Sequence, residues 1–135
     1  MDLNEFEIEM IKQCPNLYKC MLFCGESAYY EPIYEFGFEI NPGWYALLRD
    51  LSLKLEKLIV QIPEAERQKY VATQVKQKYG SFIFIMDAVT DDMKKLIGEA
   101  EHIADQTCEV CGKPGELRST AWIRVLCENH YQNFK

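Results

Sequence analysis

Residues 70–88, "YVATQVKQKYGSFIFIMDA", decide the fold because they predict the hairpin around which a sheet is built. Side chains over residues 71–79 alternate in the way that gives a strand one buried face. Gly80-Ser81 fits a two-residue turn with glycine first. The return strand "FIFIMD" is apolar at successive positions, which predicts a central strand or one covered on both faces. The alternating set is Val71, Thr73, Val75 and Tyr79 against Ala72, Gln74, Lys76 and Lys78.

Amphipathic helices are expected on both sides of this hairpin. In residues 42–63, "PGWYALLRDLSLKLEKLIVQIP", apolar side chains recur with helical spacing between two prolines. In residues 89–107, Thr90 is suited to cap a second helix, and Asp91 and Asp92 favour the positive end of its dipole. The apolar stripes are Trp44, Leu47, Leu48, Leu51, Leu55, Leu58 and Ile59 in the first helix, and Met93, Leu96, Ile97, Ala100, Ile103 and Ala104 in the second.

The first forty residues give weaker signals. Apolar residues between Leu3 and Ile11 have mostly helical spacing, and Pro15 ends that pattern. Residues 14–42 hold many aromatics without a sustained period, so we expect a loop with one short strand around Tyr34–Ile40.

Length and composition bound the fold class. A chain of 135 residues, 48% of them hydrophobic, suits one domain with its own core. We predict an α+β fold in which two main helices pack on a small antiparallel sheet, with a C-terminal zinc-ribbon-like knuckle. Residues 1–106 would form the α+β core with its acidic, aromatic N-terminal region, and residues 107–135 the zinc-binding segment of a single compact unit.

Hydropathy and the N-terminal residues indicate the compartment. No apolar run is long enough for a transmembrane helix, so we expect no membrane partner. The start "MDLNEFEIEM" is acidic, whereas a secretory signal has a basic start and an apolar block. We therefore expect a cytoplasmic protein whose cysteines are thiols or metal ligands rather than disulfides.

A metal site is predicted near the C-terminus. Cys108 and Cys111 are spaced C-x2-C, and after fifteen further residues Cys127 and His130 are spaced C-x2-H. Two close pairs at this separation are typical of a structural zinc site, because each pair forms a tight knuckle with two ligands. Gly112 and the Pro114-Gly115 pair favour the turns that such a knuckle needs.

The ligand set predicts one structural zinc and no catalytic residues. Four good ligands close the coordination sphere, whereas a catalytic zinc keeps a position open for water. Residues 112–126 contain no histidine, which argues against a nuclease of the HNH type. The proline and upstream H-x-E of zinc deaminases are also missing. His102 is interpreted as a surface residue of the second helix.

Other reactive side chains have simpler interpretations. Cys14, Cys20 and Cys24 fit no common knuckle spacing, so we interpret them as buried thiols, with a second metal or redox site as the alternative. Asp87, Asp91 and Asp92 would suit magnesium, but capping of a helix start explains them more simply. A metal-dependent enzyme is the least favoured function.

The net charge of −6 lies in one part of the chain. Residues 1–40 hold two basic and eight acidic residues, and the remainder is balanced. Tyrosine-rich loops favour protein recognition. The residues we select for partner binding are Tyr29, Tyr30, Glu31, Tyr34 and Glu35. Their acidic character suits a basic protein partner, while the alternative is that most of these aromatics pack in the core.

A nucleic-acid-associated zinc module is the rival interpretation. It would use Lys113, Arg118 and Arg124 of the C-terminal segment. Residues 108–135 carry four basic and three acidic residues, which is a weak footprint for binding phosphates. A nucleic-acid partner is therefore not expected.

Three blocks of the sequence resemble a family of small, uncharacterised phage and bacterial proteins. The blocks are "GFEINPGWYALLRDLSLKLEKL", "TQVKQKYGSFIFIMDAVTDDMKKLIGEAE" and "TCEVCGKPGELRSTAWIRVLCENH", the last with the T-C-E-V-C-G-x-P-G pattern of the family. The resemblance covers residues 35–131 in the same order. Where the family often has G-D-G-W, this chain has "NPGW". The resemblance implies a phage or prophage setting in a bacterial host cell and no known activity.

These observations together favour a non-enzymatic interaction protein stabilised by zinc. In a phage setting, its acidic aromatic surface would inhibit a host protein, such as a defence protein.

Overall fold

The chain is a mixed α/β protein with a three-stranded and a two-stranded sheet. The computed structural model describes residues 2–22, 31–119 and 121–134. The helices are α1 (Glu5–Gln13), α2 (Pro32–Phe36), α3 (Tyr45–Ile59), α4 (Asp91–Ala104) and α5 (Glu128–Phe134). The strands are β1 (Phe38–Glu39), β2 (Ala72–Lys78), β3 (Ser81–Met86), β4 (Glu116–Ser119) and β5 (Ile123–Leu126). Short 3-10 helices are η1 (Lys19–Met21), η2 (Pro42–Trp44) and η3 (Glu64–Lys69).

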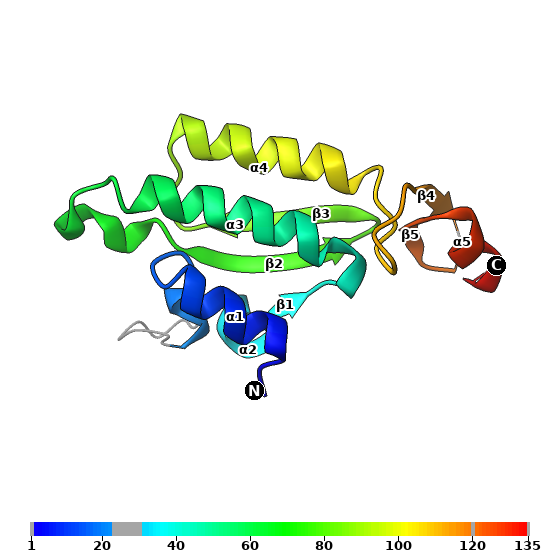
Figure 1. Ribbon diagram of the computed structural model, residues 1–135, viewed down its shortest axis with the longest axis horizontal. Helices are drawn as coiled ribbons and strands as arrows, with labels where there is room; N and C mark the ends of the chain where they lie inside the picture. Colours follow the sequence, from blue (N-terminus) through cyan, green and yellow to red (C-terminus); the bar gives the residue numbers. More distant parts are fainter. Residues whose placement is uncertain (1, 23–30, 120, 135) are drawn as a thin grey trace.

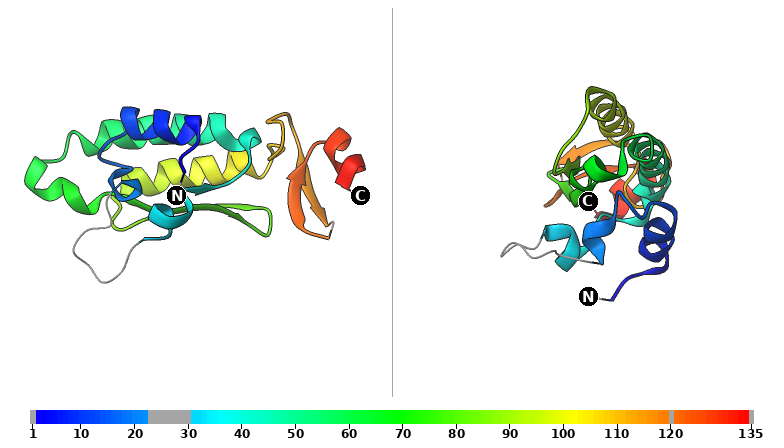
Figure 2. Two further views of the ribbon diagram at one scale, coloured as in Figure 1. Left: turned by 90° about the horizontal axis from the view of Figure 1, so that it is seen from below. Right: turned by 90° about the vertical axis from the view of Figure 1, so that its left-hand side faces the viewer.

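The elements form an elongated molecule (Figure 1). Helices α1, α3 and α4 lie on one side of the three-stranded sheet, and β4, β5 and α5 lie at one end of the long axis (Figure 2). The apolar cluster between helices and sheet continues into the C-terminal segment through Val125. Among the described helices, none is both long and apolar enough to cross a membrane.

The predicted hairpin is present, but its turn is shifted by one residue. β2 pairs antiparallel with β3, and Lys78 is opposite Ser81. The turn therefore consists of Tyr79 and Gly80, both with positive φ (52° and 83°), as turns that match strand twist require. The predicted Gly80-Ser81 turn is wrong because Ser81 already belongs to the strand.

β2, and not the apolar return strand, is central to the sheet. The strand order is β1-β2-β3, with β1 parallel to β2. The prediction of an antiparallel sheet therefore holds for the hairpin but not for β1. β3 is an edge strand with one exposed face, because Phe82 and Phe84 are buried whereas Ile85 is 45% exposed.

The two predicted main helices are confirmed. α3 buries the expected stripe, and α4 begins where Thr90 Oγ1 accepts a hydrogen bond from Met93 N at 3.2 Å. Ile103 is the exception in α4, since half of its side chain is exposed. After α3 the chain continues into the 3-10 helix η3.

The N-terminal region contains more helix than expected. α1 begins with a capping box between Asn4 and Glu7, and it ends at Gln13, before Pro15, as predicted. The first three residues of the expected strand at 34–40 instead belong to α2, which Pro32 starts and Gly37 ends with a φ of 62°. Only residues 38–39 pair with β2.

Two buried carboxylates fix the N-terminal region, one between α1 and β1 and the other on α3. Glu7 Oε2 accepts a hydrogen bond from Phe38 N at 2.8 Å, which ties α1 to β1. Glu56 of α3 accepts from Asn16 Nδ2 at 2.7 Å and from Leu17 N at 2.9 Å. Burial of a carboxylate is costly unless it is hydrogen-bonded, and both carboxylates have such partners.

Candidate metal centre

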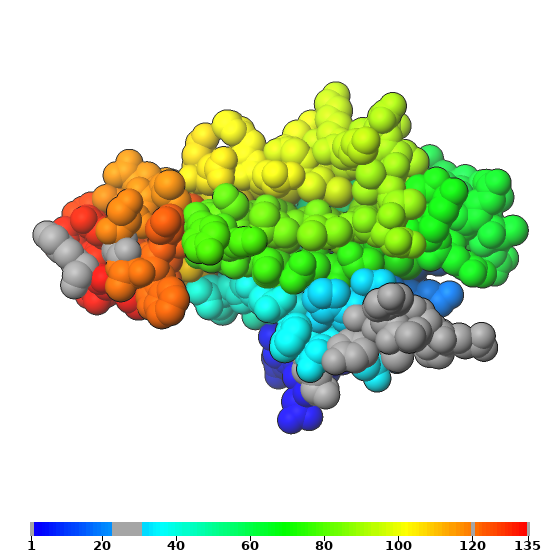
Figure 3. Space-filling view, turned by 180° about the vertical axis from the view of Figure 1, so that it is seen from behind, coloured from blue at the N-terminus to red at the C-terminus, as the bar shows by residue number. Residues whose placement is uncertain are grey.

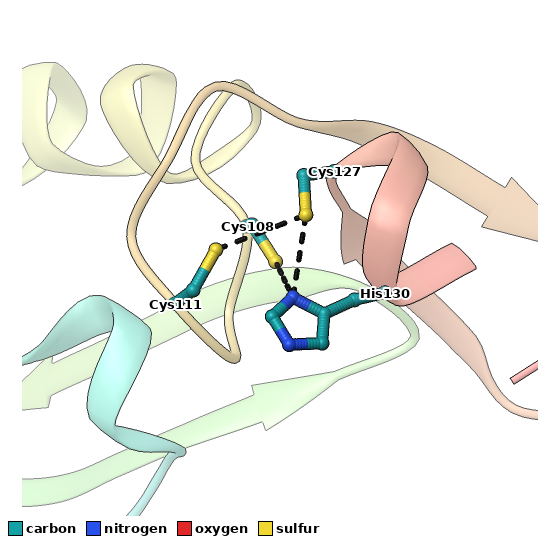
Figure 4. A group of neighbouring side chains, drawn as sticks. All are labelled: Cys108, Cys111, Cys127 and His130. Atoms are coloured by element: carbon teal, nitrogen blue, oxygen red, sulfur yellow. Dashed lines mark hydrogen bonds between the residues drawn. The ribbon is translucent and has the colours of Figure 1, made fainter. Parts of the chain in front are cut away.

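The first knuckle follows directly from the end of α4. Gly112 N donates to Cys108 O at 2.8 Å, and Cys108 N donates to Lys113 O at 2.8 Å. Gly112 has a φ of 81°, a backbone region that glycine occupies without strain. The sequence Cys-x-x-Cys-Gly therefore turns the chain so that both sulfurs project to one side (Figure 4).

The second knuckle lies at the end of the β4–β5 hairpin. This hairpin brings the chain back beside the first knuckle, with Glu116 opposite Leu126. Cys127 immediately precedes α5, and His130 lies in the first turn of that helix. Tyr131 N donates to Cys127 O at 2.9 Å, so the helical turn fixes the two ligands relative to each other.

The four ligand atoms lie close enough to bind one metal ion. All of them are within 4.8 Å of one another. Cys111 Sγ is 3.8 Å from Cys127 Sγ, and His130 Nδ1 is 3.2 Å from Cys127 Sγ and 3.6 Å from Cys108 Sγ. Two sulfurs bound tetrahedrally at about 2.3 Å from an ion are about 3.8 Å apart. The three cysteines and His130 thus come together as the sequence predicted, in a group compatible with a metal site.

Backbone amides prepare Cys108 to act as a ligand. Its burial acts to raise the thiol pKa, but the backbone N–H groups of Cys127, Cys111 and Val110 oppose this and lower the pKa to about 6. Hydrogen bonds to a charged form favour that form, and metals bind the thiolate. For Cys111, a backbone hydrogen bond from Lys113 acts to lower the pKa, but burial and the neighbouring cysteines raise it.

Glu109 lies between Cys108 and Cys111 in the sequence. Its side chain joins this first knuckle to residues 5–104, which we call the body. Its side chain is buried, and its Oε2 accepts a hydrogen bond from Gln77 Nε2 of β2 at 2.9 Å. Its Oε1 accepts from Asn41 Nδ2 at 3.3 Å and lies 3.4 Å from Arg124 Nε. Sequence reasoning missed this role. One signal in the sequence was the glutamate inside the Cys-x-x-Cys turn. Metal binding does not require a glutamate there, so its presence indicates another role.

The start of α3 forms the other part of the junction. Gly43 N donates to Glu109 O at 2.9 Å, and Trp44 Nε1 donates to Thr107 O at 2.9 Å. A Cβ at Gly43 would lie 2.3 Å from Cys108 O. Only glycine fits this position, so "PGW" is a docking site for the knuckle as well as a helix start.

The two predicted arginines of a nucleic-acid surface are engaged inside the segment. Arg118 forms ion pairs with Glu116 at 3.1 Å and Glu128 at 3.3 Å, and its guanidinium lies 4.4 Å from the centre of the Tyr131 ring. Arg124 pairs with Glu109 and stacks over Phe134 at 4.4 Å. These contacts reduce the charge available to phosphates, although Lys113 is exposed.

The other reactive side chains form no second metal group among the described residues. Burial raises the pKa of the Cys14 thiol to about 12, and it also raises the pKa of Cys20, which is partly buried. Cys24 lies outside the described residues. His102 is exposed on α4, as expected, with Gln106 Nε2 3.4 Å from its Nε2.

The predicted partner-binding residues lie on and before α2. Tyr34 and Glu35 are exposed, Glu31 is half-buried, and Tyr29 and Tyr30 lie outside the described residues. The described aromatic residues between positions 17 and 45 are divided between core and surface. The buried ones are Tyr18, Phe38 and Trp44, and the clearly exposed ones are Tyr34 and Phe36.

Comparison with known proteins gives no family for this chain. No family model matches it, and neither a curated protein nor a solved structure does.

Proposed function

We propose that the chain is a non-enzymatic, zinc-stabilised interaction protein with a C-terminal zinc ribbon. The observation that carries the first part is the Cys3His cluster, whose four ligand atoms converge from two knuckles. Three thiolates and one imidazole in tetrahedral spacing are the ligands that zinc prefers in structural sites.

The arrangement favours a structural role for zinc. When bound, the ion links the end of α4, the β4–β5 hairpin and α5. A catalytic zinc has three protein ligands and one water, whereas four side chains of this chain already reach a single point (Figure 4). Folding free energy in such small segments comes largely from the metal.

Metal analysis of purified variants tests the site. We expect one zinc per wild-type chain, and loss of that zinc with a lower melting temperature in Cys108→Ser and Cys127→Ser. Cys20→Ser is the matched control, because it removes a thiol outside the cluster and should keep the metal. Full zinc content and an unchanged melting temperature in either ligand variant would contradict the assignment.

The interaction role rests on the acidic surface beside α2. Exposed Tyr34, Glu35, Phe36 and Glu39 place aromatic rings and carboxylates together on one short stretch. Rings with few rotatable bonds add contact area at low entropic cost, and carboxylates speed encounter with a basic protein. In a phage or prophage setting in the bacterial cytoplasm, the partner would be a host protein that this contact inhibits.

Affinity capture from bacterial lysate tests this role. The tagged wild type should retain a stoichiometric basic protein, and Glu35→Lys should lose it while keeping its zinc. Glu99→Lys is the matched control, since Glu99 is an exposed acid on α4 and its reversal makes the same change in net charge. Absence of any stoichiometric partner would count against the interaction role and leave the zinc site unaffected.

A further inference from the structure

A groove lies where the metal-binding segment meets the carboxyl ends of the parallel strands β1 and β2. Its volume is about 420 Å³, and its walls come from both parts of the chain, including Glu39, Asn41 and Gln77 on one side and Glu109, Trp122 and Arg124 on the other. Junctions between structural units and strand ends are frequent locations of binding sites. Figure 3 shows the C-terminal segment against the end of the hairpin.

A second depression continues from the first. It has a volume of about 280 Å³ and is lined by Lys76, Lys78 and Tyr79 of the hairpin, together with Trp122. Trp122 contributes to both depressions. Its side chain is 76% exposed, and that of Tyr79 is 71% exposed. Large aromatic side chains are usually among the more buried residues, so this pair is available for contact.

The charge here is opposite to that of the N-terminal region. Among ion pairs of the described residues, none involves Lys76 or Lys78. Arg124 also lines the groove, but it is paired with Glu109 through Nε and stacks over Phe134. Glu109 is already in an ion pair with Arg124. Glu39 is the exposed acidic residue among those that line the groove.

We propose that this Trp122 surface, made of Lys76, Lys78, Tyr79 and Trp122, binds an extended acidic segment of a partner protein. An apolar side chain of that segment would enter the groove beside Trp122, and its carboxylates would meet the two lysines. The inference rests on the proposed interaction role. It adds a second surface, complementary in charge to the acidic one beside α2.

A peptide fits these observations better than a nucleic acid. Single-stranded nucleic acids require a continuous cationic track as well as stacking rings. This surface offers only a few cations, Arg118 is committed to Glu116 and Glu128, and the whole chain has a net charge of −6. Tryptophan, tyrosine and arginine around a depression are instead the residues that dominate protein–protein binding energy.

Selection from displayed random peptides on the zinc-loaded protein tests the proposal. Enriched peptides should be acidic and carry one aromatic or long aliphatic residue. Their binding can be followed by tryptophan fluorescence, because the chain has two tryptophans and Trp44 is fully buried. Trp122→Ala, and Lys76→Glu combined with Lys78→Glu, should each weaken binding by about tenfold or more. Lys94→Glu with Lys95→Glu on α4 is the matched control and should leave affinity nearly unchanged.

Several outcomes would overturn the proposal. These are no enriched peptide, enrichment of basic or uncharged peptides, equal affinity of the Trp122→Ala variant, or tighter binding of oligo-dT than of the selected peptides. Zinc content is measured on every variant, so loss of peptide binding with retained zinc concerns this surface alone. Capture of a host protein that depends on Glu35 but not on Trp122 would support the interaction role and reject the second surface.

Discussion

The body and the metal-binding segment differ in what lies inside them. Residues 5–104 enclose a continuous cluster of aromatic and aliphatic side chains on which α1, α3 and α4 pack. Among residues 107–119 and 121–134, the buried side chains are Cys108, Glu109, Val125 and Leu126. Such a small apolar set stabilises a fold weakly. The difference indicates that the body depends on hydrophobic burial, whereas on the proposed function the segment depends on a bound metal and on its junction with the body.

Removal of the metal should have the largest effect and should separate the two regions. Structural zinc sites in small segments contribute about 10–16 kcal/mol of apparent binding free energy at neutral pH. After chelation, we expect amide protection to disappear in residues 107–131 and to persist in α3 and α4, as hydrogen exchange would measure. Restoring zinc is the control for reversibility. Unchanged protection of β4 and β5 would show that the segment folds without metal.

A cavity in the body should give the opposite pattern. Leu55 is fully buried in α3, so Leu55→Ala should lower the free energy of unfolding by about 2–5 kcal/mol. Zinc content at moderate temperature should stay at the wild-type value, since no ligand is near this position in the sequence. Denaturant melts with parallel metal analysis measure both. Loss of zinc from the folded variant would mean that the two regions are not separable.

The junction should respond to a single added methyl group. In Gly43→Ala, the new Cβ would meet Cys108 O at 2.3 Å, and the knuckle would have to shift. Overpacking of this kind costs about 1–3 kcal/mol. We expect a lower melting temperature and weaker zinc retention in competition with a chelator. Equal retention by variant and wild type would show that the knuckle can move away from α3 freely.

The buried thiol of the body should make stability depend on alkaline pH. The pKa of Cys14 is raised to about 12 by burial and by nearby Glu56, against an ordinary value of 9.0. The unfolded chain therefore loses this proton first as pH rises, so the stabilisation is complete below pH 9 and is lost as pH increases towards 12. The difference in unfolding free energy between wild type and Cys14→Ala should shrink over that range. A constant difference would contradict the pKa shift.

Substitution of Gly98, an exposed glycine of α4, should have the smallest effect on stability. It contrasts with substitution of Gly43, which has no free space around it. A Cβ at Gly98 of α4 would meet nothing within 4 Å. Gly98→Ala should raise the free energy of unfolding by about 0.5–1 kcal/mol, because alanine favours helix and restricts the unfolded chain. Thermal melts of the two glycine variants should therefore change in opposite directions. A destabilised Gly98→Ala variant would reveal a contact on this face of α4.

The sequence predicts the grouping of the three cysteines with His130, and the main helices, because both depend on local spacing. Cys108, Cys111, Cys127 and His130 form their cluster through two short turns, and α3 and α4 follow a helical repeat. Strand order depends on distant pairing, and nothing within "FIFIM" indicates that β3 is an edge. The parallel β1–β2 contact arises through Glu7, which holds β1 from α1.

The junction was the least predictable part of the site. Glu109 acquires its partners from Asn41 and Gln77, which are 68 and 32 residues away in the sequence. The exposure of Trp122 likewise depends on how the β4–β5 hairpin sits against the body. These features combine residues whose individual patterns indicate only a loop, a strand and a knuckle.

The Tyr79–Gly80 turn lies against the β4–β5 hairpin, so the position of that hairpin limits the length of the β2–β3 hairpin. A Cβ at Gly80 would lie 2.4 Å from Leu117 Cδ1 of β4, so the tip of the β2–β3 hairpin abuts the metal-binding segment. An extra pair of residues in β2 and β3 would lengthen that hairpin by about 3.4 Å per residue and push it into β4. Insertions that most hairpin loops tolerate are thus excluded here, and any change in the length of this hairpin requires a compensating change in the path from Cys111 to Cys127.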